Sequence, residues 1–225
     1  MIEIYCMNIT KDFTTDKTQY LLRHVSNETR ERFNKFRFME DALRNLYGEA
    51  LVRYIGTTQF NLKTHQLTFI KNKYGKPYIY DNPIFFNISH SGNWVVCAFS
   101  SSEIGVDIEK IKEMKLSIAK SFFSGYEYAT LLNMNDAQQL DYFYTIWTLK
   151  ESYIKWLGTG LSTPLNSFSF DLNNKNVLLS HNENIQNNLC FKQYSISEYK
   201  LSVCSENKNF PERVNEISIK DIFIS

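Results

Sequence analysis

The chain has 225 residues, of which 43% are hydrophobic and 15% aromatic, enough apolar material for one large domain or two small ones. This composition excludes an intrinsically disordered chain. The 25 basic side chains nearly balance the 24 acidic ones, so the formal charge of +1 excludes a whole-molecule field that attracts nucleic acid or an anionic membrane.

Membrane insertion and disulfide frameworks are not expected from this sequence. Its apolar runs are far shorter than the roughly 20 residues that span a bilayer, and the N-terminus lacks a basic segment followed by an apolar one. Four scattered cysteines without a CxxC pair indicate reduced thiols: Cys6, Cys97, Cys190 and Cys204. We expect a soluble, cytoplasmic protein.

The N-terminal part alternates between strand-like and helical patterns. Residues 2–6 alternate as a half-buried strand does, and residues 27–54 are helical in pattern, with Ser26 or Asn27 as the cap. Apolar side chains recur along that span at three- and four-residue spacing, which predicts one core face: Ala42, Leu43, Leu46, Ala50, Leu51 and Tyr54.

Turn residues and short apolar runs follow. A glycine and a proline around a lysine mark a turn at residues 73–78, and residues 85–88 resume as a strand before a polar loop at 89–93. Residues 94–99 and 104–108 both favour β structure, and a hairpin is the simplest arrangement for them.

The C-terminal part begins with helices and ends with strands. Residues 116–123 and 127–132 look helical, and a longer helix over 138–157 should stop near the glycines of 158–160. The predicted strands after it are 167–172, 177–179, 190–195 and 200–204. Because strand, helix and strand patterns occur twice, we predict an α+β fold of two similar lobes, residues 1–102 and 103–225.

The sharpest local motif is the pair Asp107 and Glu109. One residue separates them on a predicted strand, so both carboxylates point the same way while Val106 and Ile108 point into the core. Two neighbouring carboxylates repel unless a cation offsets them, and Mg²⁺ commonly takes one or two carboxylates together with a substrate phosphate. The alternative is a strand end with two solvated acids.

A second motif lies on the long predicted helix. Glu151 and Lys155 are four residues apart and share a face, with Lys150 on its flank. Such a pair is commonly a solvated salt bridge, but the aromatic residues around it indicate a packed surface, where charges need partners. Brought to a metal held by Asp107 and Glu109, this face would add a third carboxylate and a cation for phosphate.

Two further features could bind phosphate. The segment around Ser89 and His90 can aim backbone N–H groups and a hydroxyl at phosphate oxygens, or it can simply satisfy a turn. Among the basic residues of the N-terminal helical region, which also suit a solvated face, Arg44 is the best candidate because it follows the core stripe closely.

Five blocks occur in one order along the chain: Lys73–Pro77, Phe86–Gly92, Ile104–Glu109, Phe122–Ser124 followed by Glu127, and Trp147–Lys155. Together they resemble the signature blocks of the Sfp-type 4′-phosphopantetheinyl transferases. The resemblance implies a monomer of two similar α+β lobes, with coenzyme A in the cleft between them. It also implies activity on carrier proteins in secondary metabolism, such as nonribosomal peptide and antibiotic biosynthesis.

The resemblance also assigns roles to residues. It implies that Mg²⁺, or Mn²⁺, is held by Asp107, Glu109 and Glu151. It implies that phosphates are contacted by these side chains: Arg44, Lys76, Ser89, His90, Lys150 and Lys155. The turn Tyr74, Gly75, Lys76 and Pro77 would hold the adenine. Relatives often have a lysine where this chain has Thr29 beside Arg30, which leaves the contribution of Arg30 and Arg32 open.

The implied reaction transfers phosphopantetheine from coenzyme A to a carrier-protein serine. Glu151, or a water that it orients, is the candidate base, and Lys155 is the candidate for offsetting or protonating the leaving oxygen. Carrier proteins are typically acidic, so we expect an apolar docking face with positive charge, and four residues between Lys112, Lys115 and Lys120 fit it: Leu116, Ile118, Phe122 and Phe123. Core packing explains Phe122 and Phe123 equally well.

Two alternative functions use the same residues. A divalent-metal phosphodiesterase would employ Asp107, Glu109 and Glu151 with water as the only acceptor. A non-catalytic module that binds coenzyme A or a carrier would not require the full acidic set.

Overall fold

The structure is a computed structural model that describes residues 1–9, 14–173, 176–181 and 184–223. The elements up to residue 102 are β1 (Ile2–Asn8), α1 (Thr15–His24), α2 (Asn27–Phe33), α3 (Met39–Thr58), the 3-10 helix η1 (Thr64–Gln66), β2 (Phe69–Lys71), β3 (Pro77–Ile79), β4 (Phe85–Ser91) and β5 (Trp94–Ser100).

The elements after residue 102 are β6 (Ile104–Lys110), α4 (Leu116–Phe122), α5 (Gly125–Leu132), α6 (Asp136–Leu157), η2 (Gly160–Ser162), η3 (Leu165–Ser167), β7 (Phe168–Asn173), β8 (Asn176–His181), β9 (Asn184–Ile185), β10 (Cys190–Ile196), β11 (Tyr199–Ser205), β12 (Asn215–Glu216) and η4 (Asp221–Phe223).

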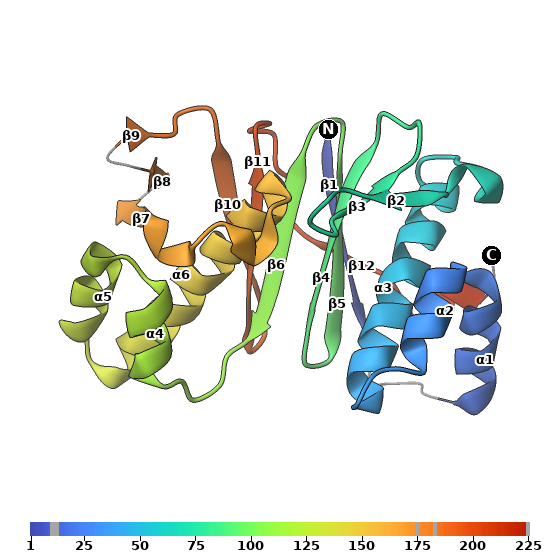
Figure 1. Cartoon of the computed structure of the whole chain (residues 1–225), viewed down its shortest axis with the longest axis horizontal. Coiled ribbons are helices and arrows are strands. Elements are labelled where there is room, and N and C mark those ends of the chain that lie inside the picture. Colours follow the sequence, from blue (N-terminus) through green and yellow to red (C-terminus); the bar gives the residue numbers. More distant parts are fainter. Residues whose placement is uncertain (10–13, 174–175, 182–183, 224–225) are drawn as a thin grey trace.

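Two β-sheets lie at the centre of the molecule and helices cover them on the outside (Figure 1). One sheet has the strand order β12-β1-β5-β4, and α3 packs on it together with α1 and α2. The other has the order β10-β11-β6, and α6 packs on it. This arrangement confirms the predicted α+β class and is consistent with two similar lobes.

Alternating side chains of the central strands fill separate cores. In β5, Val95 and Phe99 face α3, while Val96 and Ala98 face the second sheet. The layer between the sheets is built from apolar side chains of both lobes, among them Ile4, Ile104, Val106, Ile108 and Leu201. Burial of apolar surface stabilises a fold by roughly 25 cal/mol per Å². The contact between the two sheets therefore holds the lobes together.

Helix α6 ends at residue 157, as the sequence predicts, and begins two residues before the predicted start at 138. Asn135 caps α6 in a reciprocal capping box with Gln138, and Gly158 ends the helix in the left-handed region at φ +69°. Ser26 caps α2 by accepting from the amide of Thr29. The predicted core face of α3 is buried, and Tyr54 packs partly buried against the same core.

Three expectations about local structure are wrong. The helical span 27–54 is two helices with a break between them, and α1 precedes it unpredicted. Residues 94–99 and 104–108 do not form a hairpin, because β5 pairs with β1 and β4 whereas β6 pairs with β11. Residues 89–91 belong to strand β4 rather than to a polar loop.

Two other expectations have an answer in the structure. The four cysteines are free thiols, and burial raises the pKa of the Cys97 and Cys204 thiols well above the ordinary value. In the described part of the chain, no helix has the length and apolar character needed to cross a bilayer.

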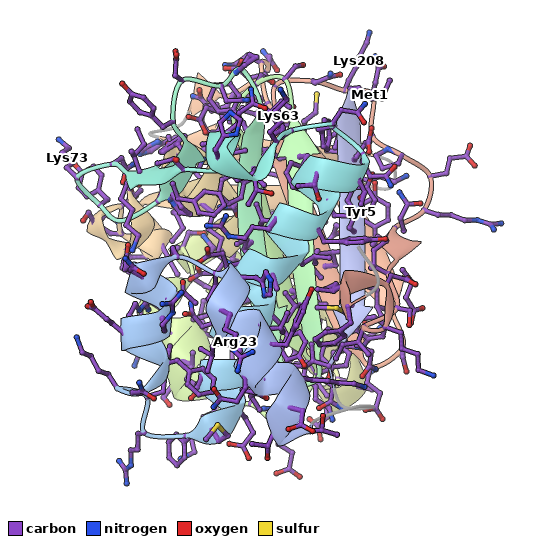
Figure 2. The ribbon with its side chains drawn as sticks, turned by 90° about the vertical axis from the view of Figure 1, so that its right-hand side faces the viewer. Met1, Tyr5, Arg23, Lys63, Lys73 and Lys208 are labelled. Atoms are coloured by element: carbon purple, nitrogen blue, oxygen red, sulfur yellow. The ribbon has the colours of Figure 1, made fainter. Side chains whose placement is uncertain are left out.

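Figure 2 shows the N-terminal lobe from outside, with Arg23 on α1 in front and Lys73 at the tip of the turn between β2 and β3. That turn reaches away from its own lobe and contacts the other one. The side-chain amide of Asn72 donates to the carbonyl oxygen of Gly158 over 2.7 Å, at the end of α6. A Cβ at Gly158 would crowd the Asn72 amide and Lys76, so the glycine serves both the helix end and this contact.

Candidate active site

Strand β6 and helix α6 bring the predicted catalytic residues together. Asp107 and Glu109 lie on the same face of β6, and α6 packs closely on that strand. Gly105 makes the close approach possible, because a Cβ there would overlap the carbonyl oxygen of Ser152 and the amide of Trp156. The helix face that carries Glu151 and Lys155 is thereby placed over the two carboxylates.

Asp107 is the most buried member of this group, with 3% of its surface exposed. Its Oδ1 accepts from the ammonium of Lys155 at 2.6 Å and from the hydroxyl of Ser89 at 2.9 Å, and Lys155 also contacts that hydroxyl at 2.9 Å. Its Oδ2 is buried and has no hydrogen-bond partner among the described residues. One oxygen of a buried carboxylate is thus left without the partner that such groups normally have.

Glu151 has a raised pKa. Burial, together with the negative charges of Asp107 and Glu109 and against the opposing charge of Lys155, raises its pKa to about 7. Burial and the charge of Asp107 also raise the pKa of Glu109. A carboxyl group with a pKa near neutrality can hold or release a proton under physiological conditions.

This shift predicts how stability depends on pH. Because folding raises the pKa of Glu151 above its ordinary value of 4.5, the stability that this group contributes is complete below that value and is lost as pH rises through about 7. In EDTA, the free energy of unfolding of the native protein should fall between about pH 5 and about pH 8, with up to roughly 3 kcal/mol from this group.

The measurement is thermal and urea unfolding across that pH range, for the native sequence and for Glu151→Gln. The variant keeps a neutral side chain at every pH, so its stability should decline less steeply. Parallel pH profiles for the two proteins would show that Glu151 has no raised pKa.

The carboxylate oxygens are ligands that a hard cation such as Mg²⁺ prefers, although they are not close enough together to form a complete metal site. Across the described ranges, no three His, Cys, Asp or Glu side chains are grouped closely enough to hold an ion. The positive charge next to Asp107 comes from Lys155 instead. The unpartnered Asp107 Oδ2 and the mutually repelling carboxyl groups nevertheless form a set of oxygen donors typical of Mg²⁺ sites.

The prediction that Lys150 contacts phosphate is wrong. Its side chain is fully buried and forms an ion pair of 2.8 Å with Glu127, which is equally buried. It also donates to the carbonyl oxygens of Leu165 and Phe168 at 2.8 and 2.7 Å, so its three protons have protein acceptors. Lys150 precedes Glu151 by one residue, which is about 100° around the helix, so Lys150 points into the core of its own lobe while Glu151 and Lys155 share the face over the strands.

A cavity of about 240 Å³ lies in the N-terminal lobe, and its lining residue His90 is close enough to Lys155 of the carboxyl cluster to feel its charge. Among the predicted ligand-binding residues, it is lined by Arg44, Gly75, Pro77 and His90. His90 lines the cavity, and the loss of surrounding water there, with the charges of Lys155 and Arg44, lowers its imidazole pKa to about 4. The ring is therefore a neutral donor or acceptor at pH 7.

Two predicted residues of the adenine turn lie outside the cavity lining. Tyr74 is exposed, with the ammonium of Lys73 over its ring at 4.8 Å. Lys76 is buried and was expected to contact phosphate, which is wrong. Its ammonium donates to Glu103 at 2.5 Å and to the carbonyl oxygens of Ile104 and Trp156.

These acceptors of Lys76 belong to the start of β6 and the end of α6, so the side chain joins the turn of one lobe to the catalytic elements of the other. Burial lowers the pKa of the ammonium, and Glu103 opposes this shift.

The structure separates Arg30 from Arg32, which the sequence left open. The guanidinium of Arg30 donates to the carbonyl oxygens of Leu22 and Val25 and so caps the end of α1. Arg32 lines the cavity, next to the buried Thr29. Arg32 is thus the member of the basic patch that can meet a ligand there.

Sequence reasoning missed two polar residues of the cavity. Asn45 lines it, and its Oδ1 is buried without a hydrogen-bond partner in the described structure. Glu49 also lines it and is buried, accepting from the backbone and hydroxyl of Ser26 and from Arg53. Both lie one turn apart on α3 near Arg44, but a helical pattern alone did not distinguish them from solvated positions.

The proposed apolar docking residues divide between surface and core. Leu116, Ile118 and Phe122 are 39%, 37% and 39% exposed on α4. Phe123 is 3% exposed and stacks on Phe143, so its expected place on a docking face is wrong. Helix α4 ends at Phe122, and the chain then turns Phe123 inward before the cap of α5.

Comparison with known proteins places the whole chain in one family. Residues 12–102 match the model of the 4′-phosphopantetheinyl transferase N-terminal region, and residues 103–204 match that of the 4′-phosphopantetheinyl transferase superfamily. The chain is 40% identical to the 4′-phosphopantetheinyl transferase Sfp of Bacillus subtilis, over 98% of this chain and 100% of that protein. It belongs to the 4′-phosphopantetheinyl transferase family.

Two further relatives of this phosphopantetheinyl transferase are similar over most of their length. The transferase ffp of Bacillus subtilis is 43% identical over 96% of this chain and 98% of its own. The transferase gsp of Aneurinibacillus migulanus is 36% identical over 91% of this chain and 86% of its own. The protein is therefore a transferase enzyme, as its motifs predicted, and the cluster around Asp107 is its candidate active site.

Proposed function

We propose that this transferase moves the 4′-phosphopantetheine group from coenzyme A to a serine hydroxyl of an apo carrier protein. The observation that carries the proposal is the Asp107–Lys155–Glu151 cluster together with a cavity that presents Arg32, Arg44 and His90, where the charge of Lys155 acts on the His90 imidazole. Acidic and basic groups side by side suit a phosphate diester whose charge must be offset during attack. Adenosine 3′,5′-bisphosphate would be the second product.

The cavity would hold the nucleotide half of coenzyme A. Arg32 and Arg44 supply guanidinium groups that bind phosphate oxygens with two donors, and His90 supplies a further contact. Ser89 is bound to both Asp107 and Lys155, and the next residue along β4, His90, lines the cavity. Phosphate groups held in the cavity would therefore extend toward the catalytic residues.

A divalent cation would be held by Asp107, Glu109 and Glu151, with Mg²⁺ as the expected ion and Mn²⁺ as a substitute. When bound, it would supply positive charge to the pyrophosphate oxygens. Glu151 would accept the proton of the carrier serine, directly or through a water, while the serine oxygen forms a bond to the β-phosphorus. Lys155 would neutralise or protonate the oxygen that leaves with the electron pair of the broken P–O bond.

The carrier protein would dock on α4. Leu116, Ile118 and Phe122 expose apolar surface there, and Lys112, Lys115 and Lys120 flank it. Such a surface suits an acidic partner helix. We expect the enzyme to act as a monomer, because one chain provides the residues proposed for both substrates.

One assay tests the proposal against its two alternatives. The protein is incubated with coenzyme A, Mg²⁺ and an apo carrier protein, and the carrier is examined by mass spectrometry. A transferase adds phosphopantetheine to the carrier, a phosphodiesterase releases free phosphopantetheine, and a binding module does neither. An unmodified carrier, with several carriers tried, would overturn the proposed function.

The two arginines on α2 give a matched test of the nucleotide cavity. Arg32→Ala should raise the KM for coenzyme A about 10-fold or more, because one charge-assisted phosphate contact contributes roughly 1.5–3 kcal/mol. Arg30→Ala should leave KM unchanged and lower thermal stability, because Arg30 holds the end of α1. Equal KM values for the native protein and Arg32→Ala would remove Arg32 from the binding site.

A further inference from the structure

A repeated side-chain pattern joins the two lobes beside the active site. The edge strands β4 and β6 lie next to each other, but among the described residues β4 pairs by its backbone only with β5. Three side chains of β4 act in place of backbone carbonyls as acceptors for the amides of β6. Asn87, Ser89 and Ser91 accept from the amides of Val106, Ile108 and Lys110 at 2.9, 3.2 and 3.1 Å.

The two serines have a second contact that the asparagine lacks. The hydroxyl of Ser89 donates to Asp107 at 2.9 Å, and the hydroxyl of Ser91 donates to Glu109 at 2.7 Å. Each serine therefore accepts from the strand backbone and donates its single proton to the neighbouring carboxylate. A serine hydroxyl can do both at once, since it has one donor and two acceptor positions.

The second contact limits how each carboxylate can turn. In Asp107 the hydroxyl of Ser89 and Lys155 share one oxygen, so that carboxylate has two partners that fix it. In Glu109 the hydroxyl of Ser91 contacts Oε2, and no ion pair of Glu109 occurs in the described structure. The longer and less buried glutamate thus depends on a single serine for its orientation, with Oε1 left to meet a cation.

We propose that Ser91 is a positioning residue of this enzyme, which holds the Glu109 carboxylate in the orientation that binds the divalent cation. This inference rests on the proposed function, because it assigns Glu109 to the cation site. Groups that hydrogen-bond to a metal ligand orient it, and their loss typically lowers metal affinity about 10- to 100-fold.

The experiment measures Mn²⁺ binding by calorimetry for the native protein, Ser91→Ala, Ser91→Thr and Asn87→Ala, with thermal unfolding of each. Ser91→Ala should weaken Mn²⁺ binding about 10-fold or more. Ser91→Thr keeps a hydroxyl on a strand position and should restore most of the affinity. Asn87→Ala loses the same kind of contact to β6 without touching a carboxylate, so it should lower stability but bind Mn²⁺ as the native protein does.

Three results would overturn the inference. The first is native-like Mn²⁺ affinity in Ser91→Ala. The second is equally weak Mn²⁺ binding in Asn87→Ala, which would assign the effect to the contact between the lobes. The third is a native protein that binds no Mn²⁺. Transfer by the native protein is measured in parallel. If the native protein modifies the carrier while Ser91→Ala binds Mn²⁺ normally, the proposed function stands and only the role of Ser91 fails.

Discussion

Lys150→Met is expected to destabilise the protein by about 3–5 kcal/mol, because it leaves the Glu127 carboxylate buried without its cation. Both side chains of this ion pair have no exposed surface, and Lys150 also satisfies the carbonyl oxygens of Leu165 and Phe168. Methionine has a similar shape, so the loss would come from unpaired polar groups rather than from a cavity. Urea unfolding followed by circular dichroism measures the change.

Two further variants make this expectation specific. Lys200→Met removes a lysine whose ion-pair partner, Asp141, is 64% exposed and stays hydrated, so its loss should change stability much less. Combining Lys150→Met with Glu127→Gln removes the buried charge and should recover part of the lost stability. Native-like unfolding of Lys150→Met alone would mean that the ion pair contributes little to folding.

The helix α6, with clear periodicity and a glycine at its end, was predictable, and the last part of strand β4 was not. Helix α6 could be placed because Gly158 and the apolar spacing mark its course. The polarity of Ser89 and Ser91 predicts a loop at the end of β4. In the structure their hydroxyls accept from backbone amides of β6, which makes a strand of polar residues possible. This contact joins segments 18 or 19 residues apart, which local patterns do not reveal.

The same limit explains the assignments of the lysines. Sequence spacing correctly put Glu151 and Lys155 on one helix face and Asp107 and Glu109 on one strand face, and the structure brings these faces together. Lys150 and Lys76 matched the family motif equally well, but each satisfies carbonyl oxygens inside the protein. Whether a motif lysine faces ligand or core depends on which carbonyl groups lack partners in the folded chain, and that is a tertiary property.

The second large effect is expected at Asp107. Asp107→Asn should lower the rate of carrier modification about 100- to 1,000-fold, the usual effect of removing one group that stabilises charge in a reaction. The free energy of unfolding should change little or rise. Burial raises the pKa of Asp107, so the ionised carboxylate opposes folding, and a neutral amide of the same shape removes that cost.

Lys155, which would lose its anion in this variant, is partly exposed and keeps its contact with Ser89. Asp141→Asn is the matched control, because Asp141 forms an ion pair of the same 2.6 Å length with Lys200 on the surface. That control should affect neither transfer nor stability. Replacing a catalytic carboxylate lowers activity but not stability, whereas replacing a structural one lowers both. A parallel fall of transfer rate and thermal stability in Asp107→Asn would therefore assign Asp107 to the contact between the lobes.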